Sequence, residues 1–352
     1  MSQPPLISII TPTFNRAKLL AKAMESVQAQ DYPFWEMRIW DDGSSDETPD
    51  MVANCGDPRI HYGRGTNRGQ AFARNQAFQQ AKGEYIAFLD DDDRWLPGKL
   101  ARQVRILEQF REVDVLFANF ENMDVVHGNT RRSFDANRDI LGLMKTEPLE
   151  PGVNLIRDGF PQSFLQRNFI LPSSTMMRQS VCAAVGPFNE TLRGSEDKEF
   201  WWRCAVRGAC FAYVEETFVV RRKGPDSFSL GGEHAENENI KALLCCLEDA
   251  EQVGRTDLKL AVERAIATAW EDRIKVFGGE GQRRKALKAF QRRCRYGMSL
   301  RAAVLAVCSL CTPWVLRSFG KQANQCVNRL ASSEPSIEPN PVFETHHEAE
   351  RF

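Results

Sequence analysis

Adjacent acidic residues are the feature of this sequence best suited to chemistry. The four aspartates 90–93 follow the apolar run 85–89, and such close negative charges repel one another unless cations compensate them. Hard cations such as Mg²⁺ or Mn²⁺ bind oxygen ligands, commonly one or two carboxylates together with substrate phosphates. The run therefore predicts a metal and phosphate site, the alternative being a solvated acidic turn before the helix that starts near Pro97.

Three further polar clusters each allow a chemical and a structural interpretation. Asp41 and Asp42 end a β-rich run, where a turn with a helix N-cap has the same composition. Segment 69–75 offers a glycine and a helix N-terminus, which suit a phosphate but equally an ordinary helix start. Glu196 and Asp197 begin a helical pattern, where a carboxylate either serves as a general base or simply caps the helix.

The elements that position these clusters alternate between strand and helix patterns. We expect strands at 6–10, 35–40, 59–62, 85–89 and 113–120, with helices at 16–30, 45–54, 69–81 and 97–110. Units of this kind imply a parallel sheet with helices on both faces, and such sheets bind ligands at the carboxyl ends of their strands. Three polar clusters, at 11–15, 41–42 and 90–93, directly follow expected strands, so they should converge on one edge of the sheet.

With the rest of the chain included, the sequence predicts three regions: 1–223, 224–330 and 331–352. Periodicity is weak over 121–168, and 169–222 indicates two helices among short strands, which completes an α/β domain at 1–223. Residues 224–330 begin with a loop and continue as helices, with breaks at Gly254 and at 278–279. The Ser-, Pro- and Glu-rich segment 331–352 predicts a disordered acidic tail.

Charge is distributed unevenly along the chain. The formal net charge is -1, but 281–330 holds eleven Lys and Arg and no acidic residue, whereas 1–280 carries an excess of eight acids. The apolar stretch 302–316 is too short to span a bilayer and contains Pro313. We expect 281–330 to contact an anionic membrane surface, the alternative being a helix packed on the body. Because aromatic residues are not interleaved with the charges, no nucleic-acid partner is expected.

Composition restricts the class of protein. With 352 residues, 42% of them hydrophobic and 26% charged, the chain is globular over most of its length. Ten cysteines are too sparse for a disulfide scaffold, and 1–10 has neither the basic nor the long apolar part of a secretion signal. The expected location is therefore the cytoplasm, with peripheral attachment to the cytoplasmic face of the membrane.

Taken together, the clusters resemble the family 2 glycosyltransferases. The order and spacing match over 1–222, and five motifs together are far more specific than any one of them. The motifs are SIITPTFNR at 8–16, WDDGSSD at 40–46, NRG at 67–69 with ARN at 73–75, FLDDDD at 88–93 with Pro97, and Glu196-Asp197.

The resemblance implies a GT-A nucleotide-sugar-binding fold, a mostly parallel twisted sheet flanked by helices, here with a helical C-terminal extension. It also implies transfer of a sugar, with inversion and the help of Mg²⁺ or Mn²⁺, from a nucleotide diphosphate sugar. A UDP-sugar is the favoured donor, and a hydroxyl of a glycan or lipid-linked molecule is the acceptor. Transfer of single sugars is expected, because the Gln-x-x-Arg-Trp signature of processive synthases is absent.

The same resemblance implies roles for individual residues. Asp197 would deprotonate the acceptor hydroxyl, and Asp92 would coordinate the metal directly. The donor-binding residues would be Thr11, Pro12 and Thr13 at the nucleoside, Asp41 at the base, Arg68 at the nucleotide, Asp91 at the ribose and metal, and Asp90 at the donor.

One departure from the family concerns the donor phosphates. Many relatives have a histidine after the last strand of the catalytic domain, where this chain reads RRKGP at 221–225. Arg222 or Lys223 would then face the phosphates, with His234 as a distant substitute.

Two other functions remain as alternatives. A sugar nucleotidyltransferase shares the nucleotide-binding layout, but its Gly-rich, Arg-bearing loop is missing after 6–10. A non-catalytic nucleotide-binding scaffold is the second alternative, against which the intact aspartate run and Asp197 argue.

Overall fold

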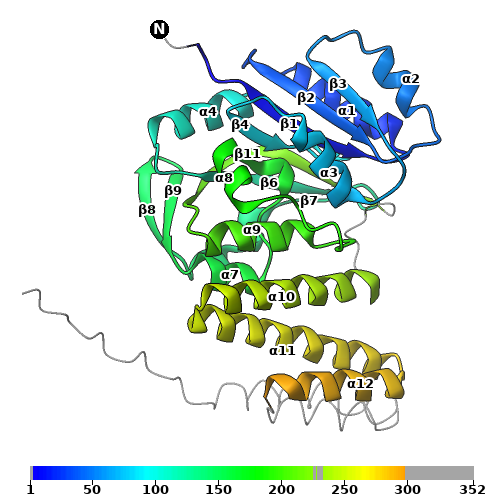
Figure 1. Cartoon of the computed structure of the whole chain (residues 1–352), viewed down its shortest axis with the longest axis vertical. Helices are drawn as coiled ribbons and strands as arrows, with labels where there is room; N and C mark the ends of the chain where they lie inside the picture. Colours follow the sequence, from blue (N-terminus) through cyan, green and yellow to red (C-terminus); the bar gives the residue numbers. More distant parts are fainter. Residues whose placement is uncertain (1–2, 225–226, 228–232, 298–352) are drawn as a thin grey trace, which may run out of the picture. The chain divides into compact units, whose positions relative to one another are not determined.

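The computed structural model describes residues 3–224, 227 and 233–297 (Figure 1). The chain divides into two compact units between Ala269 and Trp270, inside the helix α11 (Thr256–Gly279). The domain boundary at 223, where the strand β11 (Phe211–Lys223) ends, stays a prediction, since the first compact unit continues to Ala269.

The first unit contains a sheet with eleven strands among the described residues. Its main path runs β3-β2-β1-β4-β10-β6-β11-β9-β8, while β5 pairs with β11 and β7 pairs with β6. Besides β11, the strands are β1 (Ile7–Thr13), β2 (Trp35–Asp41), β3 (Ile60–Arg64), β4 (Tyr85–Phe88), β5 (Arg94–Trp95), β6 (Val115–Asp124), β7 (Thr130–Arg132), β8 (Lys145–Glu150), β9 (Val153–Asp158) and β10 (Thr175–Arg178).

Strands β1 to β4 form the parallel part that the sequence predicts. Strand β1 pairs in parallel with both β2 and β4, so that Thr13 lies beside Asp41 and Ile10 beside Phe88. Their apolar runs are continuous because both faces of these strands are covered: Ile9 belongs to one hydrophobic cluster and Ile10 to the other.

The expected mostly parallel sheet is in fact mixed. Strand β10 lies between β4 and β6 and is antiparallel to both. Strand β11 runs parallel to β6 but antiparallel to β9. The segment 121–168, whose periodicity is weak, supplies the short strands β7 to β9 at one side of the sheet.

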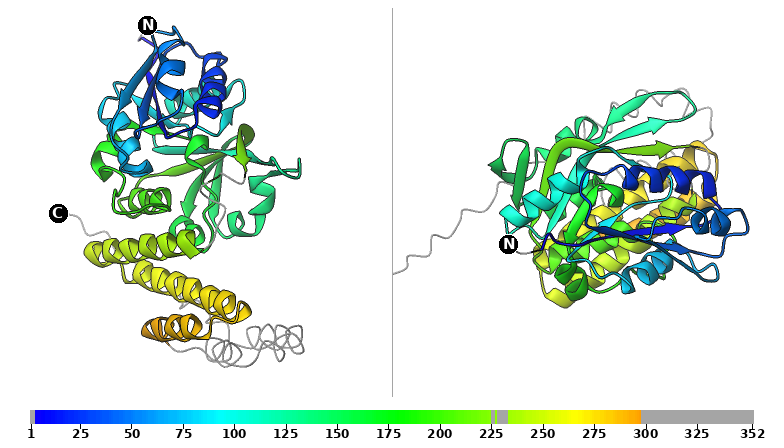
Figure 2. Two further views of the ribbon diagram at one scale, coloured as in Figure 1. Left: turned by 90° about the vertical axis from the view of Figure 1, so that its right-hand side faces the viewer. Right: turned by 90° about the horizontal axis from the view of Figure 1, so that it is seen from above.

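Helices cover both faces of this sheet, as can be followed in Figures 1 and 2. One cluster packs side chains of α1 and α4 against the sheet, and the other packs side chains of α3, α7, α8 and α9. The helices of the first unit are α1 (Ala17–Gln28), α2 (Thr48–Ala53), α3 (Gln70–Gln79), α4 (Lys99–Gln109), α5 (Ser133–Ala136), α6 (Arg138–Leu141), α7 (Phe160–Gln166), the 3-10 turn η1 (Pro172–Ser174), α8 (Gln179–Val185), α9 (Glu196–Val206), α10 (Glu233–Val253) and the first part of α11.

The second unit consists, in its described part, of the end of α11, the helix α12 (Arg283–Arg293) and the turn η2 (Cys294–Tyr296). The breaks expected near Gly254 and 278–279 are confirmed, since α10 ends at Val253 and α11 at Gly279. Within this unit Arg293 Nε donates to buried Glu271 at 2.9 Å. The apolar stretch 302–316 and the acidic tail 331–352 lie outside the described residues.

Candidate active site

The loops after β1, β2 and β4 meet at the carboxyl edge of the parallel strands, as the sequence predicts. Two cavities open there. The first, which we call the carboxylate cavity, has a volume of about 140 Å³. Its lining residues are Arg16, Gln70, Arg74, the four aspartates 90–93, Leu171, Pro172, Gly194, Ser195, Glu196, Asp197, Arg221 and Arg222.

The second cavity is larger, about 420 Å³. Of the residues expected to bind the nucleotide, Pro12, Thr13 and Asp91 line it. The complete lining is Pro12, Thr13, Phe14, Arg16, Asp42, Asn67, Gly69, Gln70, Ala73, Asp91, Arg193 and His234. Since Arg16, Gln70 and Asp91 line both cavities, the two are neighbouring parts of one site.

Asp91 is the aspartate that connects the two cavities. Its carboxylate accepts hydrogen bonds from the Thr13 hydroxyl at 2.8 Å and from Arg16 Nη1 at 3.0 Å. Only 5% of Asp91 is exposed. Burial raises the pKa of Asp91 to about 7, against the lowering effects of Arg16 and Thr13.

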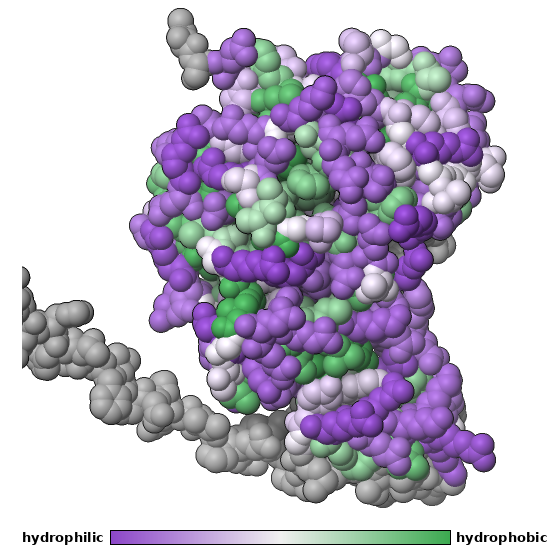
Figure 3. Space-filling model, in the orientation of Figure 1, coloured by the Kyte–Doolittle hydropathy of each residue, from purple (hydrophilic) through white to green (hydrophobic). Residues whose placement is uncertain are grey.

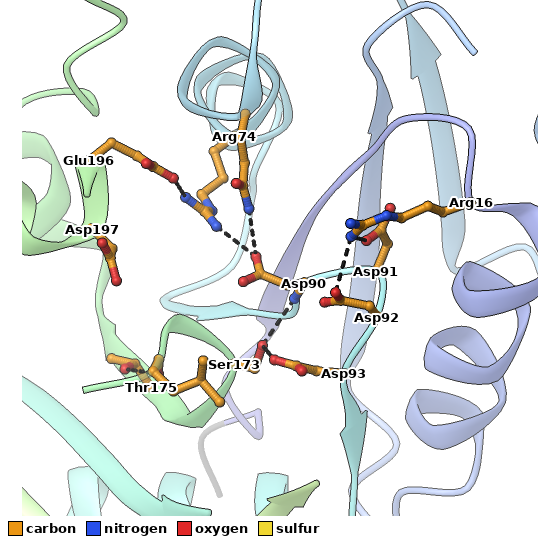
Figure 4. A network of polar contacts seen from close by, with 12 residues as sticks. Arg16, Arg74, Asp90, Asp91, Asp92, Asp93, Ser173, Thr175, Glu196 and Asp197 are labelled. Atoms are coloured by element: carbon orange, nitrogen blue, oxygen red, sulfur yellow. Dashed lines mark hydrogen bonds and ion pairs between the residues drawn. The ribbon is translucent and has the colours of Figure 1, made fainter. Parts of the chain in front are cut away.

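Asp92 shares the Arg16 guanidinium with Asp91, at a distance of 3.1 Å (Figure 4). Burial, together with the neighbouring Asp90, raises the pKa of the Asp92 carboxyl. A single arginine therefore neutralises part of the charge on this pair of carboxylates. The sequence-based interpretation named Arg16 in a motif but gave it no role.

Asp93 and Asp90 have their own partners. The Ser173 hydroxyl donates to Asp93 at 2.6 Å and accepts the backbone N–H of Asp90 at 3.1 Å. Asp90 itself accepts from Arg74 Nη2 at 2.6 Å. Burial, together with the neighbouring carboxylates of Asp92 and Asp90, holds the pKa of the Asp93 carboxyl well above its usual range, although the Ser173 hydroxyl lowers it.

Among the described residues, no cluster of three or more His, Cys, Asp or Glu side chains has the arrangement of a metal site. Mg²⁺ and Mn²⁺ nevertheless need only one or two carboxylates when a substrate diphosphate supplies further oxygen ligands. Asp91 and Asp92 provide two adjacent carboxylates bridged by one cation, Arg16. These residues fit a divalent ion that arrives with a diphosphate, not one held by protein alone.

Asp197 stands in the first turn of α9 and lines the carboxylate cavity. Its Oδ2 accepts from Asn168 Nδ2 at 3.1 Å, and its Oδ1 accepts the backbone N–H of Lys198 at 2.8 Å. The preceding Ser195 has a positive φ of 58° and makes no side-chain capping hydrogen bond. The half-buried Asp197 carboxylate is thus held in place by Asn168, which the sequence did not single out.

The two aspartates at the end of β2 occupy different positions. Asp41 is fully buried and lines neither cavity; Ser44 N–H donates to one of its oxygens at 2.7 Å and the Tyr62 hydroxyl to the other at 2.5 Å. Asp42 lines the larger cavity and accepts the backbone N–H groups of Arg68 and Gly69, at 2.9 and 2.7 Å. Burial raises the pKa of the Asp42 carboxyl, although these N–H groups lower it.

Two more of the expected nucleotide contacts lie outside both cavity linings. Thr11 is fully buried within β1. The Arg68 side chain is exposed, stacks over the Phe72 ring at 3.8 Å and pairs with Glu190 at 3.2 Å. Its backbone reaches the site, because the N–H donates to Asp42 and the carbonyl accepts from Arg193, which also lines the larger cavity.

The positions of the basic residues near the site agree in part with those expected from the sequence. Arg221 and Arg222 line the carboxylate cavity, whereas Lys223 does not. His234, at the beginning of α10, lines the larger cavity although it is far away in sequence. The helical extension therefore contributes to the site through His234, which the sequence offered only as a distant substitute.

A sheet that gathers buried aspartates at the carboxyl ends of its parallel strands, opposite a carboxylate on a facing helix, has the layout of a ligand-binding site of α/β enzymes. The chain belongs to glycosyl transferase family 2, whose family model matches residues 8–184.

Two curated relatives illustrate the similarity. The putative colanic acid biosynthesis glycosyl transferase WcaA of Escherichia coli (strain K12) is 43% identical over 122 residues, which are 34% of this chain and 44% of that protein. The GalNAc(5)-diNAcBac-PP-undecaprenol beta-1,3-glucosyltransferase of Campylobacter jejuni is 45% identical over 101 residues, 28% of this chain and 33% of that protein. The matched segments thus span less than half the length of these relatives.

Two solved structures have a similar fold. S. aureus TarS 1-349 in complex with UDP-GlcNAc superposes with a TM-score of 0.62 at 18% identity, covering 93% of this chain and 91% of that one. The mannosyltransferase PcManGT from Pyrobaculum calidifontis, in complex with GDP-Man and Mn2+, has a TM-score of 0.51 at 18% identity, covering 95% and 89%. The GT-A fold expected from the sequence is confirmed.

Proposed function

We propose that this chain is an inverting glycosyltransferase that moves single sugars from a nucleotide diphosphate sugar to a hydroxyl of a glycan or lipid-linked acceptor. The observation that carries the proposal is the carboxylate cavity, which brings Asp91 and Asp92 together with Asp197 from a different motif. Inverting transfer needs a base on the face of the sugar opposite the leaving group, and a single carboxylate is sufficient for it.

In this mechanism Asp197 accepts the proton of the acceptor hydroxyl as that oxygen attacks the anomeric carbon. Asn168 holds the carboxylate through Oδ2, which fixes the orientation of the base before the acceptor arrives. The leaving nucleoside diphosphate gains negative charge as the bond to the sugar breaks. Arg221 and Arg222, on the wall of the same cavity, are placed to stabilise that charge.

Asp92 is the residue we assign to direct contact with Mg²⁺ or Mn²⁺, with Asp91 beside it. When bound with the donor, the ion would neutralise charge on the β-phosphate. Arg16 contacts Asp92 through Oδ2, so it would neutralise part of the carboxylate charge beside the ion. The structure of the mannosyltransferase PcManGT, which contains GDP-Man and Mn2+, supports this assignment of the metal by analogy.

The larger cavity is the proposed site of the nucleoside. Thr13 and Pro12 would contact it along β1, and Asp91 would bind the ribose hydroxyls. We place the base contact at Asp42, because it lines the cavity, and give buried Asp41 the role of holding the turn. A UDP-sugar is favoured: the TarS structure contains UDP-GlcNAc, and WfgD of Escherichia coli, 38% identical over 119 residues, is named a UDP-Glc-dependent glucosyltransferase.

A lipid-linked acceptor is favoured by the names of the relatives. The Campylobacter jejuni enzyme is named for an undecaprenol-linked glycan and WfgD for a diphosphoundecaprenol. No helix among residues 3–224 and 233–297 is both long and apolar enough to cross a membrane. The proposed location is the cytoplasmic face of the membrane, where such an acceptor would be reached from the surface.

The helix α12 provides a surface for this attachment. Hydrophilic side chains predominate over it (Figure 3), and Leu287 among them is 41% exposed. The exposed basic side chains of α12 and of the following turn η2 are Arg283, Arg284, Lys285, Lys288, Arg292 and Arg295. An anionic lipid surface attracts each such residue by about 1 kcal/mol.

The donor is tested by adding UDP-, GDP- and dTDP-sugars with Mg²⁺ or Mn²⁺ and following thermal unfolding. A ligand present at about 100 times its Kd stabilises the folded chain by about 2.7 kcal/mol. We expect a metal-dependent shift with UDP-sugars and release of UDP once an undecaprenyl-diphosphate glycan is added. The proposal fails if no nucleotide sugar stabilises the protein or if UDP is never released.

The membrane contact is tested by flotation with vesicles of anionic or zwitterionic lipid. Binding is expected only to anionic vesicles, and K288E together with R284E should weaken it by at least about tenfold. Equal binding of the variant would contradict the assignment to α12.

A further inference from the structure

Asn75 of α3 fastens the loop 186–195, which leads into α9, to the helix α3. The Asn75 side chain donates to Phe188 O at 2.9 Å and accepts Phe188 N–H at 2.8 Å. It also donates to Glu190 at 3.0 Å. Arg74, the residue before it, points to the carboxylate cavity.

Arg74 connects the two acidic motifs of the site directly (Figure 4). Its Nη1 donates to Glu196 and its Nη2 to Asp90, each at 2.6 Å. The Arg74 side chain is only 1% exposed, and that of Glu196 is 7% exposed. Although burial lowers it, the carboxylates of Asp90 and Glu196 hold the pKa of the Arg74 guanidinium above its usual value.

Each carboxylate that Arg74 binds is the immediate neighbour of a residue with a proposed function. Asp90 precedes Asp91, the proposed ribose contact, and Glu196 precedes Asp197, the proposed base. Both Asp90 and Asp197 line the carboxylate cavity. Through two short charge-assisted hydrogen bonds, the guanidinium therefore sets the distance between the aspartates proposed to bind the nucleotide sugar and the proposed base, Asp197.

We propose that Arg74 is a positioning residue for the transfer step, and that Glu196 is the group through which it holds Asp197. This inference rests on the proposed function, because it assigns no separate reaction. Arg74 acts without touching the sugar: it keeps the first turn of α9 at the distance from the aspartate run that the attacking oxygen and the leaving diphosphate require.

Only arginine can serve both partners in this geometry. Its planar fork directs separate N–H groups to two carboxylates, whereas a lysine offers one ammonium that cannot satisfy both from the same position. A second cation, Arg203, pairs with Glu199 one turn further along α9, with Nη2 to Oε2 at 2.9 Å. That pair is also buried but contacts neither acidic motif, so it is a matched control.

The experiment compares R74K and E196A with E196Q and with the control R203K in the full chain. Donor affinity is measured by calorimetry with UDP, and kcat and KM are measured for donor and acceptor. A misplacement of about 1 Å lowers a rate by about 100-fold. We expect R74K and E196A to lower kcat by about that factor while the Kd for UDP stays within about threefold.

The conservative variant E196Q should restore most of the activity that E196A loses. E196Q keeps an oxygen that accepts the Arg74 N–H, so its kcat should recover to within about tenfold of the wild type. R203K should lower the melting temperature with kcat within about threefold of the wild type. Hydrogen exchange of the amides in the first turn of α9 should rise in E196A and R74K but not in R203K.

The inference is overturned if E196A and R203K change kcat equally, or if E196A and R74K lose stability without loss of kcat. It is also overturned if amide exchange at the start of α9 is unchanged in E196A. If the wild-type chain transfers no sugar, the proposed function is contradicted instead. The comparison of amide hydrogen exchange among the variants then still tests whether Arg74 holds the first turn of α9.

Discussion

The hydroxyl of Thr13, the last residue of β1, donates a 2.8 Å hydrogen bond to Asp91, which lies in the loop after β4. These two residues are 78 positions apart in the chain. Parallel pairing of β1 with β4 brings the ends of both strands together, so the first and fourth motifs of the sequence share one hydrogen bond. Asp91 is thereby oriented before any ligand binds.

Replacing Thr13 by valine should weaken nucleotide binding. Valine has nearly the same shape but no hydroxyl, so Asp91 loses a donor in a buried position, at a cost of about 1–3 kcal/mol. Calorimetry with UDP should show an affinity lower by about tenfold, the equivalent of about 1.4 kcal/mol. T13S keeps the hydroxyl and should retain the affinity; equal loss in both variants would assign the effect to packing.

Replacing Asp197 by asparagine should abolish transfer and leave donor binding nearly intact. Asparagine preserves the shape and keeps one oxygen, which can accept from either Asn168 or the Lys198 N–H, but it cannot accept a proton at neutral pH. The rate should fall by about 10²–10⁴-fold, the usual contribution of a general base. If D197N loses UDP affinity in calorimetry to the same extent, Asp197 belongs to the donor site instead.

Replacing Asp92 by asparagine should remove the effect of the divalent ion. In the wild type, Mn²⁺ added with UDP should raise the melting temperature above that with UDP alone, because the ion and diphosphate bind together. In D92N the Mn²⁺-dependent part of the shift should disappear, as it should for the wild type in chelator. An unchanged shift in D92N would place the ion elsewhere.

The two aspartates at the end of β2 should give opposite results. D42N alters a wall of the larger cavity and should raise the Kd for UDP by about tenfold, since a hydrogen bond to a charged group contributes about 1.5–3 kcal/mol. D41N weakens the contacts with Ser44 and Tyr62 and should chiefly lower the melting temperature. A larger change in UDP affinity for D41N would restore Asp41 as the base contact.

Glu36 should make stability depend on pH. Burial raises its pKa, but hydrogen bonds from Arg38 and Ser8, each 2.6 Å, and from Lys82 N–H at 2.7 Å hold the pKa of Glu36 below its usual value. A lowered folded-state pKa gives stabilisation that is complete above the unfolded-state pKa of about 4.3 and is lost as the pH falls through the folded-state value.

Urea unfolding therefore should show E36Q less stable than the wild type by about 1–3 kcal/mol near neutral pH. The difference should shrink as the pH falls below about 4. E84Q, at an exposed glutamate two residues from Lys82, should follow the wild type. A difference between E36Q and the wild type that is constant with pH would contradict this assignment.

Several elements follow from the sequence because their cause is local or repeats with a fixed period. The apolar runs in β1 and β4 show strands covered on both faces, and the motif order predicts the GT-A fold. Loops that follow parallel strands must emerge at the same edge, so the convergence of the first, second and fourth motifs is implied by periodicity alone. Asp197 in the first turn of a helix is likewise a local pattern.

Other features depend on contacts between segments far apart in the chain. The antiparallel insertion of β10 is decided by its pairing with β4 and β6, not by its four residues. Adjacent Asp41 and Asp42 are chemically identical in sequence, and only the pleat and the turn bury one and leave the other at the cavity wall. The sequence determined which acidic residues gather at one edge of the sheet; the tertiary structure decided which cation each one meets, because Arg16 and Arg74 reach their carboxylates across 75 and 122 positions of chain.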